Sequence, residues 1–66
     1  MAPHIERITA EADELADRLS KLTTFLIGEK FALLPETDKS LMNAQVGAMT
    51  AYMSVLILRI QRAASV

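Results

Sequence analysis

The sequence predicts an all-α protein, in which an antiparallel two-helix hairpin assembles with further copies of itself into a homo-oligomeric helical bundle. Two long segments carry apolar residues at alternating spacings of three and four, and a short connection containing glycine and proline separates them. The second segment also has more apolar faces than one neighbouring helix can cover. A chain of 66 residues without cysteine forms at most one domain, 1–66, for which self-association is the expected stabiliser.

The first predicted helix covers about residues 3–27. Pro3 suits the first turn of a helix, where its missing N–H has no helical partner to lose. An unbroken heptad series follows, consisting of Ile5, Ile8, Ala12, Leu15, Leu19, Leu22 and Leu26. The charged residues between these positions, with the acidic ones towards the N-terminal half, are expected to form a solvated outer face.

The connection between the helices is expected at residues 28–34. Gly28 follows the first helix directly and is the expected stop after its C-terminus. Three apolar residues of the connection, Phe31, Leu33 and Leu34, are expected to fold back and cover the adjacent end of the core.

The second predicted helix covers about residues 35–62, with Pro35 as its first residue and residues 63–66 expected to fray. Its apolar seam consists of Met42, Val46, Met49, Met53, Leu56, Ile60 and Ala63. A second row contains Leu41, Ala48, Tyr52 and Val55, with Gln45 and Arg59 as its polar members. Ile57 and Leu58 lie outside both rows, so the helix is apolar almost all round near its C-terminal end and must be enclosed. Further copies of the chain are expected to enclose it.

Composition excludes several classes of protein. A hydrophobic content of 52% with 23% charged residues is typical of a folded chain, and a net charge of −1 argues against binding long nucleic acids. The charge-free stretch 40–58 is interrupted by polar residues, so no membrane is expected as a partner. The N-terminus lacks the pattern of a signal peptide, and the protein is expected inside the cell.

Catalytic chemistry is not expected. The sequence has no glycine-rich phosphate loop, no serine or cysteine nucleophile with a matching base, and no metal-ligand spacing. The single histidine, His4, cannot hold a zinc ion alone. We therefore expect neither enzyme activity nor a cofactor.

Polar residues beside the apolar seams are the candidates for ligand binding. Lys21, Thr23 and Thr24 lie in the last turns of the first helix, and Arg59 shares a row with apolar residues of the second. A guanidinium that enters an interface needs an anionic partner. Alternatively, Arg59 and Arg62 offset the helix dipole and pair with Glu6. In an antiparallel hairpin the threonines and Arg59 are about 30 Å apart by helix rise, so they can share a ligand only between protomers packed in opposite directions.

Two stretches carry a resemblance to a known group of proteins. The order "PHIERI…EADELADRLSKLTTFL", then a linker with phenylalanine and "LP", then "LMNAQVGAMTAYMSVLILRI", resembles small helical-hairpin proteins of tailed phages. These include the anti-CBASS cyclic-oligonucleotide sponges and the N-terminal hairpin of one class of anti-Thoeris sponge. The resemblance covers residues 3–62, and its most particular parts are residues 21–26 and the series Gln45, Met49, Tyr52, Leu56, Arg59 and Ile60.

The resemblance implies a hexamer of hairpins that sequesters cyclic nucleotide messengers without cleaving them, in the cytoplasm of an infected bacterial cell. In such proteins an aromatic residue and a lysine of the first helix hold cyclic dinucleotides, and three arginines and three threonines hold cyclic trinucleotides. By this comparison Lys21 would be the lysine, Thr23 or Thr24 the threonine and Arg59 the arginine. No benzenoid aromatic residue lies near the start of the first helix, where His4 and Arg7 are the nearest candidates for stacking on a base.

A rival interpretation needs no small-molecule ligand. The hairpin could form a dimeric four-helix bundle whose apolar faces are all core and whose arginines are only caps. Such a module would bind a host protein or a regulatory RNA. The surroundings of Arg59, Thr23 and Thr24 discriminate between a sponge and a bundle.

Overall fold

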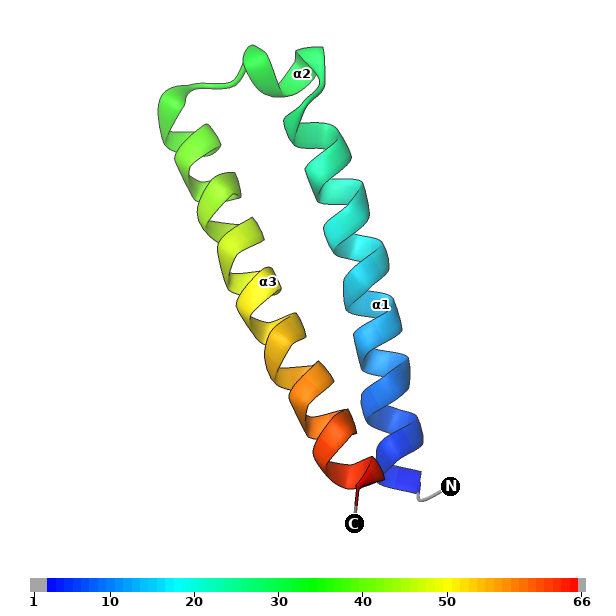
Figure 1. Ribbon diagram of the computed structural model, residues 1–66. Coiled ribbons are helices and arrows are strands. Elements are labelled where there is room, and N and C mark those ends of the chain that lie inside the picture. Colours follow the sequence, from blue (N-terminus) through cyan, green and yellow to red (C-terminus); the bar gives the residue numbers. More distant parts are fainter. Residues whose placement is uncertain (1–2, 66) are drawn as a thin grey trace.

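Two long helices lie side by side in antiparallel directions and a short helix joins them (Figure 1). The computed structural model describes residues 3–65. The elements are α1 (Pro3–Leu26), α2 (Glu29–Ala32) and α3 (Glu36–Ala64), and no strand occurs among the described residues. The all-α prediction is therefore confirmed. The start of α1 and the end of α3 lie together at what we call the open end, and α2 lies at the opposite, loop end.

The core of the hairpin is the line where α1 and α3 face each other. Ile8, Ala12 and Leu15 of α1 are buried against Leu56 of α3, which is fully buried. Met49, Met53 and Ile60 pack against this cluster. Every residue of the two predicted seams is buried or half-buried, which confirms that the heptad spacing marks the contact between the helices.

The connection differs from the sequence-based expectation at its first residue. Gly28 does follow the end of α1, and its N–H donates to the carbonyl of Phe25 at 3.0 Å. Its backbone is extended, with φ −91° and ψ 166°, instead of having the left-handed conformation usual for a glycine that stops a helix. The reason is that α2 begins at the next residue, so that Gly28 serves as the N-cap of α2, a position that requires extended backbone.

Aromatic side chains close the loop end of the core. Phe25 and Phe31 form an edge-to-face pair with ring centroids 6.3 Å apart, and the Lys39 ammonium lies 6.0 Å from the centre of the Phe31 ring. Phe31 and Leu34 are half-buried, as expected for residues that cover the core. The same expectation is wrong for Leu33, which is the C-cap of α2 and is 84% exposed.

Both ends of α3 also differ slightly from the expectation. Pro35 is the N-cap and not the first helical residue, and its carbonyl accepts the N–H of Lys39 at 3.0 Å. At the other end the helix continues to Ala64 instead of fraying from residue 63, and residue 66, to which the same expectation applied, lies outside the described residues. The Ser65 N–H donates to the carbonyl of Gln61 at 3.1 Å, and the Ser65 hydroxyl donates to the carbonyl of Arg62 at 3.1 Å, which satisfies two carbonyls of the last turn.

The outer surface of α3 is apolar and uncovered. Its large exposed side chains are Leu41, Tyr52, Val55, Ile57 and Leu58. By length and composition alone α3 could cross a bilayer, although core helices of other proteins pass the same test. Only 6% of its most apolar stretch is buried by the rest of the chain. Within one hairpin, α3 therefore lacks the enclosure that its composition calls for.

Candidate functional site

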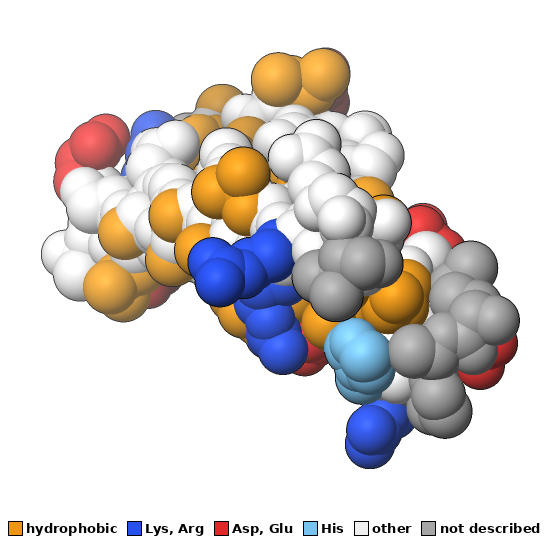
Figure 2. Space-filling model, turned by 60° about the horizontal axis from the view of Figure 1, so that its bottom comes forward, with side chains coloured by type: hydrophobic (Ala, Val, Ile, Leu, Met, Phe, Trp, Pro, Cys, Tyr) orange, Lys and Arg blue, Asp and Glu red, His pale blue; other side chains and the backbone are white. Residues whose placement is uncertain are grey.

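An open groove at the open end brings together three of the candidate residues. The groove has a volume of about 550 Å³, and its lining includes His4 and Arg7 of α1 and Arg59 of α3. The antiparallel pairing explains the meeting, because the first turns of α1 lie beside the last turns of α3. Figure 2 turns this end towards the viewer and shows Lys and Arg side chains beside the histidine. The other lining residues are Ile8, Ala10, Glu11 and Glu14.

A second hollow of about 310 Å³ adjoins the groove. It shares His4, Ile8 and Arg59 with the first hollow and adds Arg62 and Ala63. One end of the molecule thus carries three arginines and the only histidine; the larger hollow is mostly polar and the smaller one mostly apolar. Such a surface can receive an anion that also has an apolar or aromatic part.

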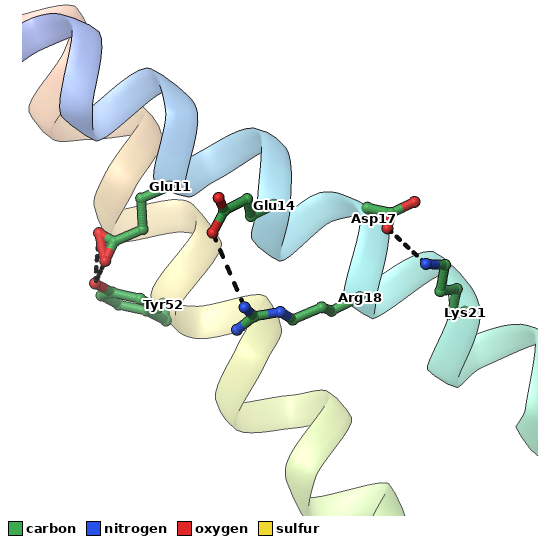
Figure 3. Close-up of polar contacts among 6 residues, drawn as sticks. All are labelled: Glu11, Glu14, Asp17, Arg18, Lys21 and Tyr52. Carbon is green, nitrogen blue, oxygen red and sulfur yellow. Dashed lines mark hydrogen bonds and ion pairs between the residues drawn. The ribbon is translucent and has the colours of Figure 1, made fainter.

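The two carboxylates of the groove have partners of their own. The Tyr52 hydroxyl donates to Glu11, with distances of 2.7 Å to Oε1 and 2.9 Å to Oε2. The carboxylate of Glu14 lies 3.9 Å from the guanidinium of Arg18 (Figure 3). Within residues 3–65, no ion pair involves Arg7, Arg59 or Arg62, and the pairing with Glu6 considered from the sequence does not form in the hairpin. The cationic groups of the open end therefore remain available to a ligand.

Tyr52 is the polar contact that sequence reasoning missed. It belongs to the predicted second row of α3, but only its position opposite Glu11 gives the hydroxyl a partner. The hydrogen bond to Glu11 raises the pKa of Tyr52 above the usual value of about 10, because it favours the protonated phenol. Burial and the negative charge of Glu11 act in the same direction, and the positive charge of Arg59 opposes them.

A pH titration tests this contact. A raised pKa means that the stabilisation by this hydrogen bond is fully present below about pH 10 and is lost as the pH rises through the pKa of the folded chain. Tyr52 is the only tyrosine, so tyrosinate absorbance reports on it alone. Glu11→Gln is expected to lower the titration midpoint towards that of free tyrosine, whereas Glu14→Gln leaves it in place. Equal midpoints in the wild-type chain and Glu11→Gln would contradict the assignment.

The remaining candidates lie near the loop end, away from the groove. Lys21 forms an ion pair with Asp17, with Nζ 2.9 Å from Oδ2 (Figure 3). The Thr23 hydroxyl donates to the carbonyls of Leu19 and Ser20, both at 3.0 Å. The Thr24 hydroxyl donates to the same Ser20 carbonyl at 2.9 Å. All three side chains are exposed, and each threonine oxygen retains the capacity to accept a hydrogen bond.

One chain therefore separates the candidates into two sets. His4, Arg7 and Arg59 meet at the open end, whereas Lys21, Thr23 and Thr24 lie on the last turns of α1, about 20 to 30 Å further along its axis by helix rise. The separation of Arg59 from the threonines agrees with the antiparallel arrangement expected from the sequence. A ligand that touches both sets must lie between two chains.

The fold is a small all-α hairpin whose open-end groove carries two arginines, a histidine and two glutamates. Among the described residues no group of three acidic, histidine or cysteine side chains is placed to hold a metal ion. The family model described as Sequestin matches residues 2–62, and the chain belongs to the Sequestin family. The family's name indicates sequestration of a ligand, and so binding instead of catalysis; the match confirms the resemblance to sequestering sponge proteins. Searches among curated proteins and among solved structures gave no match.

Proposed function

We propose that this chain is a non-enzymatic phage anti-defence protein that sequesters cyclic oligonucleotide immune messengers between the subunits of a hexamer. Cyclic trinucleotides are the first ligand class and cyclic dinucleotides the second. The protein acts in the cytoplasm of the infected bacterial cell, where removal of the messenger keeps an immune effector inactive. The observation that carries the proposal is the groove in which Arg59 meets His4 and Arg7 without an ion-pair partner.

The chemistry of the groove suits a cyclic oligonucleotide. Each phosphodiester of such a ring carries one negative charge, and the planar guanidinium of Arg59 can bind two phosphate oxygens at once. Bases stack on imidazole rings and on guanidinium planes, which His4 and Arg7 offer on the same groove. The ligand is small, so a chain of net charge −1 can bind it without the extended basic face that long nucleic acids need.

The proposed binding site is completed by a second subunit. The groove is open to solvent along its length, and one hairpin supplies only its floor and walls. A subunit that runs in the opposite direction brings its loop end, with Lys21 and either Thr23 or Thr24, to the open end of the first. The threonine hydroxyls, now bonded to Ser20, can turn to donate to phosphate oxygens.

Native mass spectrometry of the purified protein with a panel of cyclic di- and trinucleotides tests the proposal. We expect a hexamer that gains up to two cyclic trinucleotide masses, and we expect the ligand to be recovered uncleaved after denaturation. Linear trinucleotides of the same base composition are the matched control, and they should bind much more weakly because ordering a flexible chain costs free energy. A dimer that takes up no cyclic nucleotide would contradict the proposal.

A second candidate function rests on the uncovered apolar side chains of α3. A dimeric four-helix bundle could use these side chains as core or present them to a host protein, with no small-molecule ligand. Regulatory RNA is a weaker candidate for the same module because the net charge is −1. We propose neither long nucleic acid nor a membrane as a partner. Flotation with phospholipid vesicles tests the absence of membrane binding, and recovery of the protein with the vesicles would contradict it.

A further inference from the structure

A second heptad seam runs along the outside of α3. Its residues alternate in spacing by three and four, as those of the core seam do, but they lie on another side of the helix. We call this surface the outer seam, formed by Leu41, Ala44, Ala48, Ala51, Val55 and Leu58. All six residues are exposed in the hairpin, and Arg62 continues the series.

The size of the exposed surface indicates that the hairpin buries part of its surface against another chain. The hairpin exposes 5002 Å². A compact monomer of 7.3 kDa is expected to expose about 4,200 Å². The difference of about 800 Å² equals one partner's share of a standard protein–protein interface.

We infer that the occupant of the outer seam is the outer seam of a second copy, with the two α3 helices antiparallel. The register that aligns the two seams over their whole length places Leu41 opposite the partner's Leu58, Ala44 opposite the partner's Val55 and Ala48 opposite the partner's Ala51. This interface rests on the self-association proposed above and assigns to it a surface, a direction and a register.

Side-chain size supports that register. Alanines face alanines at the centre of the seam, which allows the helix axes to approach to about 8 Å. Leucine faces leucine at both ends, where the larger side chains close the interface against water. The arrangement is isologous, so each pair occurs twice about the two-fold axis.

Charge favours antiparallel over parallel packing. The N-terminal end of α3 carries Glu36, Asp38 and Lys39, and the Lys39 ammonium lies 3.5 Å from Glu36, so this end keeps a net charge of −1; the C-terminal end carries Arg59 and Arg62. Antiparallel packing places Arg62 level with the partner's Thr37, between the partner's Glu36 and the partner's Asp38. Parallel packing would set the arginines of one copy beside those of the other, and likewise the two ends of net charge −1, so like charges would repel at both ends.

The same register brings the two sets of candidate residues to one level. Tyr52 contacts Glu11 within the hairpin, and because the helices are antiparallel Thr23 and Thr24 of α1 lie at the level of Ser40 in α3. Ser40 lies next to Leu41, which opposes the partner's Leu58. Arg59 is therefore level with the partner's Thr23 and the partner's Thr24 along the axis of the pair. Burial of the outer seam and completion of the groove by a second chain therefore both require antiparallel packing.

Disulfide trapping tests the interface, since the chain has no cysteine of its own. Two single variants, Ala48→Cys and Ala51→Cys, are purified separately and then mixed under mild oxidation. Antiparallel packing brings these two positions within the Cα separation of about 7 Å that a disulfide tolerates. We expect a cross-linked dimer in the mixture and much less from either variant alone. Ser54→Cys, an exposed and nearly isosteric change on the same helix but off the seam, is the control and should not cross-link.

The outcomes separate this interface from the proposed function. Cross-linking of each variant with itself, without preference for the mixture, would indicate parallel packing and overturn the inference. A hexamer that captures cyclic trinucleotides but gives no cross-link in the mixture would also overturn it, while leaving the proposed function intact. A cross-linked pair that takes up no cyclic nucleotide would support the interface and contradict the proposed function. Flotation of the unmodified chain with phospholipid vesicles, together with no cross-link in solution, would assign the outer seam to lipid.

Discussion

Replacing Arg59 by alanine is expected to weaken the capture of a cyclic trinucleotide by at least about 10- to 100-fold. One hydrogen-bonded contact to a charged group contributes about 1.5–3 kcal/mol, and each 1.4 kcal/mol is a factor of ten in affinity. Arg59 is the arginine that lies in both hollows of the open end together with His4. If one site contains Arg59 from several subunits, the substitution removes several contacts at once and the losses of binding free energy add up. Isothermal titration calorimetry with the cyclic trinucleotide measures the effect.

Two further variants serve as controls for the Arg59→Ala prediction. Arg18→Ala removes the same charge from a side chain that is 72% exposed and contacts Glu14 at 3.9 Å, so it should leave the affinity nearly unchanged. Arg59→Lys keeps the charge but removes the planar fork, and it should fall between the wild-type chain and Arg59→Ala. Unaltered affinity in Arg59→Ala, or an equal loss in Arg18→Ala, would show that the groove is not the phosphate site.

Leu56→Ala is expected to have the largest effect on stability. Leu56 is the one described side chain with no exposed surface, and it packs among Ile8, Ala12 and Leu15. Replacing a buried leucine by alanine costs about 2–5 kcal/mol, because apolar contacts are lost and a cavity remains. A folded chain of this length has a total stability of about 3–10 kcal/mol. The loss is a large share of that total, so the variant should melt at a clearly lower temperature than the wild-type chain.

Thermal unfolding followed by circular dichroism checks this expectation. All samples need the same chain concentration, since self-association makes the melting temperature depend on concentration. Leu33→Ala is the matched control, because the same substitution at a side chain that is 84% exposed should change little. Equal melting temperatures for the two variants would mean that Leu56 is not the centre of the core.

The heptad spacing made the contact between the long helices predictable. Ile8, Leu15 and Leu56 could be assigned to the core because a side chain's face on a helix follows from its position in the sequence. The same spacing indicated that α3 has more apolar surface than α1 can cover, and the exposed Leu41 and Leu58 agree with it.

The connection was less predictable for a physical reason. Gly28 and Leu33 depend on how the chain leaves one helix and enters the next, and several short turns satisfy the same sequence. The single helical turn α2 accounts for both differences from the expectation. Gly28 is its N-cap and has extended backbone, and Leu33 is its C-cap and is exposed to solvent. No periodicity extends over so short a helix, so its presence could not be read from spacing.

For the candidate site residues, too, some features were predictable from the sequence and others were not. Their types and their helices were evident from the sequence, and so was the distance between Arg59 and the threonines, because helix rise is regular. The meeting of His4 and Arg7 with Arg59, and the bond between Tyr52 and Glu11, appeared only in the folded hairpin. Periodicity is a local property that determines which face of a helix is apolar. The register of two helices depends on how their side chains interlock, and this packing sets which polar residues become neighbours across the pair.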